Sequence, residues 1–129
     1  MPTAEPAYRR ADRSGLLHDR VREARERLAA CTLCPRRCGV NRLEGERGVC
    51  GAGRLANVSS AGPHFGEEAP LVGTHGSGTV FFGHCNLRCL FCQNFEISHL
   101  GEGREIDAGA LAECMLDLQR QGCHNINWV

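Results

Sequence analysis

Nine cysteines among 129 residues constrain this chain more than any other feature of its sequence. An odd number of cysteines cannot be used up by a closed set of disulfides, and residues 1–15 lack the apolar stretch of an export signal. In a reducing compartment, clustered cysteines are more often metal ligands or catalytic thiols than disulfides. The sequence therefore predicts a cytoplasmic protein in which the clustered thiols bind metal.

Composition excludes two classes of partner. The chain has 15 basic and 15 acidic residues, so its formal net charge is zero. Its overall charge therefore provides no electrostatic attraction to nucleic acid. No apolar run approaches the roughly 18 residues that a membrane span requires. Leu, Val, Phe and Ile together make up only about a fifth of the chain, which is close to the lower limit for a folded domain. We expect a thin core, and neither a nucleic-acid nor a membrane partner.

The first part of the chain divides into an arm and a helical, cysteine-rich module. Residues 1–13 contain prolines and arginines without periodicity and are expected to form a flexible arm. After Ser14, a plausible N-cap, Leu17, Val21, Ala24 and Leu28 recur at helical spacing. This helix opens a module over residues 14–77, in which residues 31–50 have no period and form an irregular set of turns.

The remainder, residues 78–129, follows a strand–helix–strand pattern. Thr79 to Phe82 is a short strand, Asp107 is an N-cap, and Gly122 stands where a helix-ending glycine belongs. A second strand starts at Ile126, and residues 95–105 between strand and helix are expected to form a loop. The pattern predicts an α/β fold with one βαβ unit, the start of a parallel (β/α) partial barrel, which points to a portion of a longer protein.

The most specific motif is C-x3-C-x2-C, formed by Cys85, Cys89 and Cys92 directly after the predicted strand. Thiolates select iron–sulfur clusters, zinc or cuprous ions, and three ligands on a four-coordinate centre leave one position open. The same spacing would also place three buried cysteines on one helix face. A third interpretation is a zinc site that His84 or His99 completes.

A second group consists of Cys31, Cys34, Cys38 and Cys50. Four thiolates are enough for a closed tetrahedral zinc site or a second iron–sulfur cluster. Because residues 31–50 have almost no apolar residues to bury, a metal would supply the folding free energy that burial cannot. The alternative is a set of free or redox-active thiols.

Residues 76–94, GSGTVFFGHCNLRCLFCQN, resemble the cluster-binding segment of radical S-adenosylmethionine enzymes. Together with CTLCPRRCGVNRLEGERGVC, HFGEEAP and the final NIN, they are similar more specifically to the pyruvate formate-lyase activating enzyme-like proteins. The resemblance covers residues 25–129 and only the front part of that family's length. His84 and Ala69 depart from it, since the family has a small residue and a proline at these positions.

The resemblance implies a cofactor and a reaction. Cys85, Cys89 and Cys92 would hold three irons of a [4Fe-4S] cluster, and the fourth iron would bind S-adenosylmethionine. Reductive cleavage would then give a 5′-deoxyadenosyl radical that abstracts hydrogen from a substrate. Phe91 matches a position near the adenine, although it could equally anchor the loop by packing. The implied partners are a flavodoxin or ferredoxin as electron donor and a glycyl-radical enzyme as protein substrate.

A competing hypothesis comes from a different functional class. Both cysteine groups could be structural zinc sites in a non-catalytic interaction module, with the arginine-rich helix contacting a partner. The three-ligand motif and its place at a strand end favour the enzyme. Even so, this 129-residue chain alone is expected to be inactive, and no residue is assigned a catalytic role.

Overall fold

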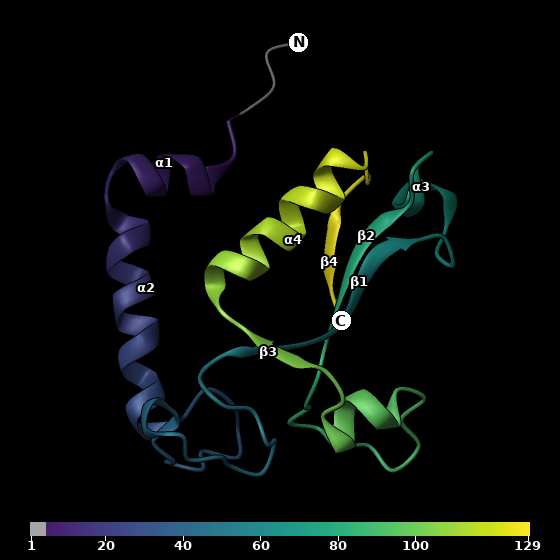
Figure 1. Cartoon of the computed structure of the whole chain (residues 1–129). Helices are drawn as coiled ribbons and strands as arrows, with labels where there is room; N and C mark the ends of the chain where they lie inside the picture. The colour runs from purple at the N-terminus through teal and green to yellow at the C-terminus, as the bar shows by residue number, and fades with distance from the viewer. Residues whose placement is uncertain (1–4) are drawn as a thin grey trace. The chain divides into compact units, whose positions relative to one another are not determined.

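A computed structural model describes residues 5–129 of the chain. They belong to two compact units, Met1–Glu46 and Arg47–Val129. The first unit contains helices and turns, and the second is built around a four-stranded mixed sheet, so the fold is mixed α/β (Figure 1). The sequence suggested a boundary between residues 77 and 78, but that position lies inside a strand, Ser77–Phe82, of the second unit.

The first unit begins with a helix where the sequence predicted an arm. Helix α1 spans Ala7–Arg13, so the expected arm is wrong for these residues, and residues 1–4 lie outside the described part. Pro6 precedes the helix and cannot break it there, because the first helical amides have no partner within the helix in any case. An ion pair between Glu5 and Arg13 spans the length of α1.

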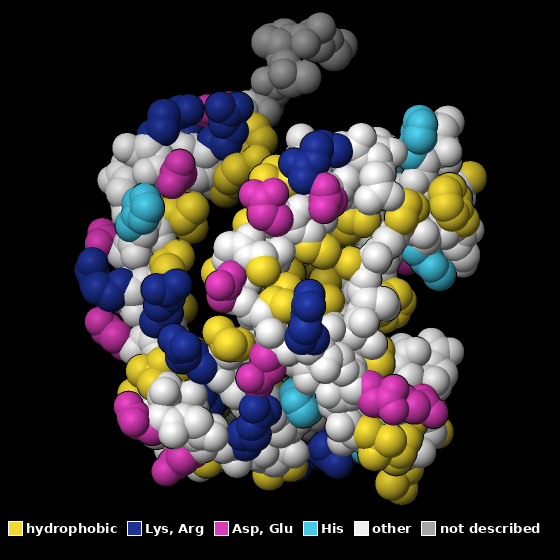
Figure 2. All heavy atoms as spheres, in the orientation of Figure 1, with side chains coloured by type: hydrophobic (Ala, Val, Ile, Leu, Met, Phe, Trp, Pro, Cys, Tyr) yellow, Lys and Arg dark blue, Asp and Glu magenta, His cyan; other side chains and the backbone are white. Residues whose placement is uncertain are grey.

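The predicted amphipathic helix is present as α2, Leu16–Glu26, and it tightens into the 3₁₀ helix η1, Arg27–Ala30. The predicted cap is displaced by one residue. Ser14 ends α1, and Gly15, with φ of +78°, occupies the position before α2 and turns the chain. Basic and acidic side chains are interspersed along α2 (Figure 2). A second 3₁₀ turn, η2, spans Arg42–Glu44.

The sheet of the second unit has the strand order β3-β1-β2-β4. Strand β1 is Ala56–His64, β2 is Ser77–Phe82, β3 is Arg104–Ile106 and β4 is Ile126–Trp128. Strands β2 and β4 pair in parallel, with Val80 opposite Trp128, whereas β1 pairs antiparallel with both β2 and β3. The parallel strand–helix–strand unit predicted from sequence is therefore confirmed, but the sheet around it is mixed.

Two strands were not expected. Strand β1 reads ANVSSAGPH, in which apolar and polar residues do not alternate beyond Ser59, and two of the three residues of β3, Arg104 and Glu105, lie in the predicted loop. Neither carries a local strand signal, and both exist because an antiparallel ladder to a neighbour satisfies their backbone groups. The chain also forms two short helices that the sequence did not indicate, α3 at Ala69–Val72 and the π-helix η3 at Glu96–Leu100.

Helix α4, Ala108–Arg120, contacts β1, β2 and β4 and covers one face of the sheet (Figure 1). Its start and end are those predicted. The Oδ1 of Asp107 accepts from the Ala110 amide at 2.8 Å, and Gly122 follows the helix with φ of +84°. Val80 on β2 and Leu118 on α4 form the centre of the core.

None of the helices in residues 5–129 has the length and apolar character of a bilayer-spanning helix.

Candidate metal centre

The C-x3-C-x2-C motif begins where β2 ends. Strand β2 stops at Phe82, and the amide of Gly83 donates to the backbone oxygen of Asn57 on β1 at 2.8 Å. His84 then takes a positive φ of 70°, and its amide donates to the Ile97 oxygen at 2.7 Å. These bonds place Cys85 at the carboxyl end of β2, as the sequence predicted, and on the edge where ligands of parallel sheets usually bind.

Two of the three motif cysteines line one cavity. The cavity has a volume of about 510 Å³ and is open to solvent. Cys85 and Cys92 are half-buried in its wall, whereas Cys89 is exposed and does not line it. The chain reverses between the last two cysteines, since the Cys92 amide donates to the Cys89 oxygen at 3.2 Å. The fold thus brings Cys85 and Cys92 to a common space and leaves Cys89 exposed to solvent outside it.

Within the described residues, no three His, Cys, Asp or Glu side chains are close enough together to hold a metal ion. A set of thiolates gathers only when a cation offsets their mutual repulsion, and metal binding therefore orders its own ligands. Loading such a site would require the three thiols to come closer together than they are here. The ligand role of the three cysteines stays a prediction.

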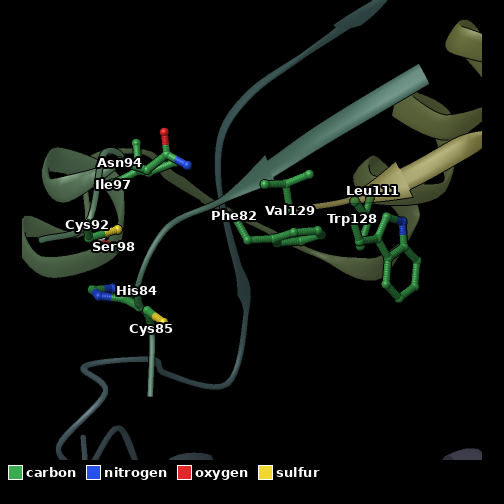
Figure 3. A pocket seen from close by; sticks show the side chains of 10 residues that line it. All are labelled: Phe82, His84, Cys85, Cys92, Asn94, Ile97, Ser98, Leu111, Trp128 and Val129. Carbon is green, nitrogen blue, oxygen red and sulfur yellow. Dashed lines mark hydrogen bonds between the residues drawn. The ribbon is translucent and has the colours of Figure 1, made fainter. Parts of the chain in front are cut away.

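The cavity has one polar and one apolar end (Figure 3). The polar end carries the two thiols together with imidazole, amide and hydroxyl groups, and the apolar end is made by the last residues of β2 and β4 and by α4. The lining residues are Phe82, His84, Cys85, Cys92, Asn94, Ile97, Ser98, Leu111, Trp128 and Val129. A ligand there would meet sulfur at one side and aromatic surface at the other.

Ser98 is a site residue that sequence reasoning missed. It is 7% exposed on η3, and its Oγ donates to the Sγ of Cys92 at 3.3 Å. The Oγ also lies 2.9 Å from the Nδ1 of His99, which supplies a donor in one tautomer. Because residues 95–105 read as a loop, no periodicity indicated that a short π-helix would return a hydroxyl to the thiol.

His84 is held between two glycine backbones. A Cβ on Gly51 would lie 2.9 Å from its Nδ1, and one on Gly101 would overlap the ring. Burial lowers the pKa of His84 below its usual value, and the positive charge of Arg47 acts in the same direction. Both effects favour the neutral form of the ring, which lines the cavity next to Cys85. The imidazole of His84 thus fits into a space that glycine at positions 51 and 101 leaves open.

Two other predicted contributors lie away from the cavity. Phe91 is 91% exposed, so within the described chain it does not anchor the loop by packing. His99 stacks on Phe95, with ring centroids 4.4 Å apart. A contact between Phe91 and an adenine remains a prediction, and so does the zinc site that His84 or His99 would complete.

Three cysteines of the second group lie on one closed turn of the first unit. The Cys31 amide donates to the Val40 oxygen at 3.0 Å, and the Gly39 amide donates back to the Cys31 oxygen at 2.9 Å. The turn carries Cys34 and Cys38 between these bonds. A hydrogen bond from the Leu33 amide lowers the pKa of the Cys31 thiol, and Arg42 adds to this effect. A readily ionised thiol suits a metal ligand.

Cys50 belongs to the second unit, where it precedes Gly51. A turn closed by the Gly51 amide and the Gly48 oxygen, 3.0 Å apart, presents it. Arg47 holds this turn by donating to the Gly51 oxygen at 2.6 Å and to the carboxylate of Glu105 on β3 at 2.6 Å. The proposed four-cysteine site stays a prediction.

The chain is similar to an uncharacterized protein of Methanocaldococcus jannaschii. The two sequences are 42% identical over 85 residues, which is 66% of this chain and 24% of that protein. The chain thus spans about a quarter of the length of the curated relative that it matches. No protein-family profile matches the chain, and no solved structure matches it.

Proposed function

We propose that this chain is the N-terminal portion of a radical S-adenosylmethionine iron–sulfur protein, with Cys85, Cys89 and Cys92 as the ligands of a [4Fe-4S] cluster. The observation that carries the proposal is the placement of the C-x3-C-x2-C motif directly after β2, at the edge where the parallel strands β2 and β4 both end. Active sites of α/β barrels lie at this edge. Three soft thiolates also match the ligand demand of such a cluster and leave one iron open.

Such a cluster would supply the electron that cleaves bound S-adenosylmethionine to methionine and a 5′-deoxyadenosyl radical, and this radical would abstract a hydrogen atom from a substrate. The residues of this chain would bind the cluster and orient the S-adenosylmethionine. Cys85 and Cys92 would provide two ligands from the cavity wall, and the exposed Cys89 would provide the third. The hydroxyl of Ser98 supports Cys92. Phe91, exposed on the same turn, is available to contact an adenine.

The wider assignments follow from the same proposal. The β2–α4–β4 unit would be the first part of a partial parallel barrel completed by further residues of a longer protein. A cytoplasmic location, a flavodoxin or ferredoxin as electron donor and a glycyl-radical enzyme as substrate would accompany it. Cys31, Cys34, Cys38 and Cys50 would bind zinc or a second cluster, and the lowering of the Cys31 pKa by the Leu33 amide supports this.

The alternative function is a non-catalytic zinc module, and the identity of the bound metal separates the two. The test is anaerobic reconstitution of the full chain with iron and sulfide, followed by electron paramagnetic resonance of the reduced protein with and without S-adenosylmethionine. We expect a cubane signal that changes when S-adenosylmethionine is added. Zinc bound without acid-labile sulfide, in this chain and in a longer one, would overturn the proposal.

Single variants assign the ligands. Cys85→Ala, Cys89→Ala and Cys92→Ala should each abolish the signal that S-adenosylmethionine changes. Cys114→Ala is the matched control, because Cys114 is also a half-buried free thiol but lies on α4. A signal that survives Cys89→Ala unchanged would remove Cys89 from the ligand set.

A further inference from the structure

Asn57 on β1 touches both ends of the part of the chain that carries the motif. We call residues 83–103 the cysteine segment. At its start, the Gly83 amide donates to the backbone oxygen of Asn57 at 2.8 Å. Near its end, the side-chain Nδ2 of Asn57 donates to the backbone oxygen of Gly101 at 2.9 Å. One residue of a neighbouring strand therefore ties the two ends together.

The side chain of Asn57 also fills the space between these ends. A Cβ on Gly83 would lie 2.9 Å from the Cγ and Nδ2 of Asn57, and a Cβ on Gly103 would overlap its Oδ1. Glycine at both positions lets the backbone of the segment approach the amide closely. The contact is thus steric as well as hydrogen-bonded.

The oxygen of the Asn57 side-chain amide makes no hydrogen bond in this position. Of the side-chain polar atoms buried in residues 5–129, the Oδ1 of Asn57 has no hydrogen-bond partner. A buried acceptor without a partner opposes folding, so a side chain of similar shape without polar atoms would satisfy the packing of β1 better. The hydrogen bond to Gly101 is what an amide adds here.

We propose that Asn57 is a positioning residue that closes the cysteine segment against β1 and thereby fixes the places of Cys85 and Cys92. Gly83 lies two positions before Cys85, and the His84 amide ties to the Ile97 oxygen at 2.7 Å just inside the closure. With both ends held, the freedom of the segment is left to the exposed turn that carries Cys89. The significance for iron rests on the proposed function, whereas the closure itself does not.

The closure can be tested on the full chain without metal by amide hydrogen exchange of Asn57→Leu. Leucine keeps a similar branched shape and removes both the donor to Gly101 and the unpaired oxygen. We expect amides within the segment to exchange about tenfold faster, while the urea midpoint of the protein is unchanged or higher. Unchanged exchange across residues 83–103 would overturn the proposal.

Asn125→Leu is the matched control. Its Nδ2 donates to a backbone oxygen at a similar distance, that of Leu71 at 2.8 Å, but Asn125 precedes β4 and does not touch the segment. Exchange within residues 83–103 should be the same as in the unaltered protein. If leucine prevents cooperative unfolding at either position, Asn57→Ala and Asn125→Ala give the same comparison, and equal exchange in these two would equally overturn the closure.

The link to the metal has its own readout. After anaerobic loading, Asn57→Leu should bind less iron per chain than Asn125→Leu and give an altered electron paramagnetic resonance signal. Faster exchange with unaltered iron content and spectrum would show that Asn57 closes the segment without positioning the thiols, which overturns that part. An unaltered protein that binds no cluster overturns the proposed function instead and leaves the exchange result standing.

Discussion

The hydroxyl of Ser98 donates to the Sγ of Cys92 at 3.3 Å, so the side of Cys92 within the cavity faces a hydrogen-bond donor rather than a hydrophobic wall. Ser98 reaches this position because the π-helix η3, Glu96–Leu100, follows closely after the last motif cysteine. Hydrogen bonds to ligand sulfurs are one of the means by which proteins set the reduction potential of an iron–sulfur cluster.

Ser98→Ala should therefore make the reduction potential of the loaded protein more negative. The donor stabilises the reduced state, which carries one more negative charge, and its loss removes that stabilisation. The same change should lower the free energy of unfolding of the metal-free protein by about 1 kcal/mol through the lost hydrogen bond. A redox titration measures the potential, with the exposed Ser59→Ala as control. A potential equal to or above that of the control would contradict the role of Ser98.

Gly51→Ala tests the packing of His84. Gly51 has φ of +81° and Gly45 has φ of +86°, so an alanine meets similar backbone strain at both, about 1–2 kcal/mol. The space differs, since nothing lies within 4 Å of a Cβ on Gly45, whereas one on Gly51 would be 2.9 Å from the Nδ1 of His84. Urea unfolding should show a larger loss of stability for Gly51→Ala than for Gly45→Ala.

The excess loss should depend on the imidazole. In a double-mutant cycle, Gly51→Ala in a His84→Ala background should cost little more than Gly45→Ala, because the steric conflict is gone. An equal cost with and without the imidazole would mean that the ring is not held where the structure places it.

Asp107→Ala should lower the free energy of unfolding by about 1 kcal/mol, because it removes the acceptor for the Ala110 amide at the start of α4. The matched control is Asp117→Ala on the same helix, where the exposed ion pair with Arg120 contributes at most about 0.5 kcal/mol. Chemical denaturation compares the two variants. Equal losses would show that the cap does not hold α4 in place.

The features of the fold that the sequence predicted all have local causes. Asp107 and Gly122 mark the ends of α4 through cap chemistry, and the apolar run at residues 79–82 marks β2. The parallel pairing of β2 with β4 follows because a helix joins two strands. Cys85 lies at the carboxyl end of β2 because it follows the last residue of that strand, Phe82, by only three positions.

The features that were missed depend on partners distant in sequence. Strand β1 has no strand pattern of its own, and its register against β2 shifts between Val58 and Ser60. Its Asn57 therefore gave no sign that it would meet both Gly83 and Gly101. In the same way, the motif spacing does not distinguish Cys85, Cys89 and Cys92 from one another. In the fold, Cys85 and Cys92 line the cavity and Cys89 lies outside it.

That inequality predicts the order in which the thiols react. In the metal-free protein, iodoacetamide should label Cys89 before Cys85 and Cys92, because Cys89 is exposed and the other two are half-buried. After anaerobic loading with iron and sulfide, all three should lose reactivity together, since a ligand thiolate is no longer a free nucleophile. Peptide mass spectrometry follows each site, with Cys114 as the internal reference whose labelling iron should not change. A Cys89 that is labelled at its metal-free rate while Cys85 and Cys92 are protected would mean that the turn does not close, and that the centre holds only the two thiols that already share the cavity.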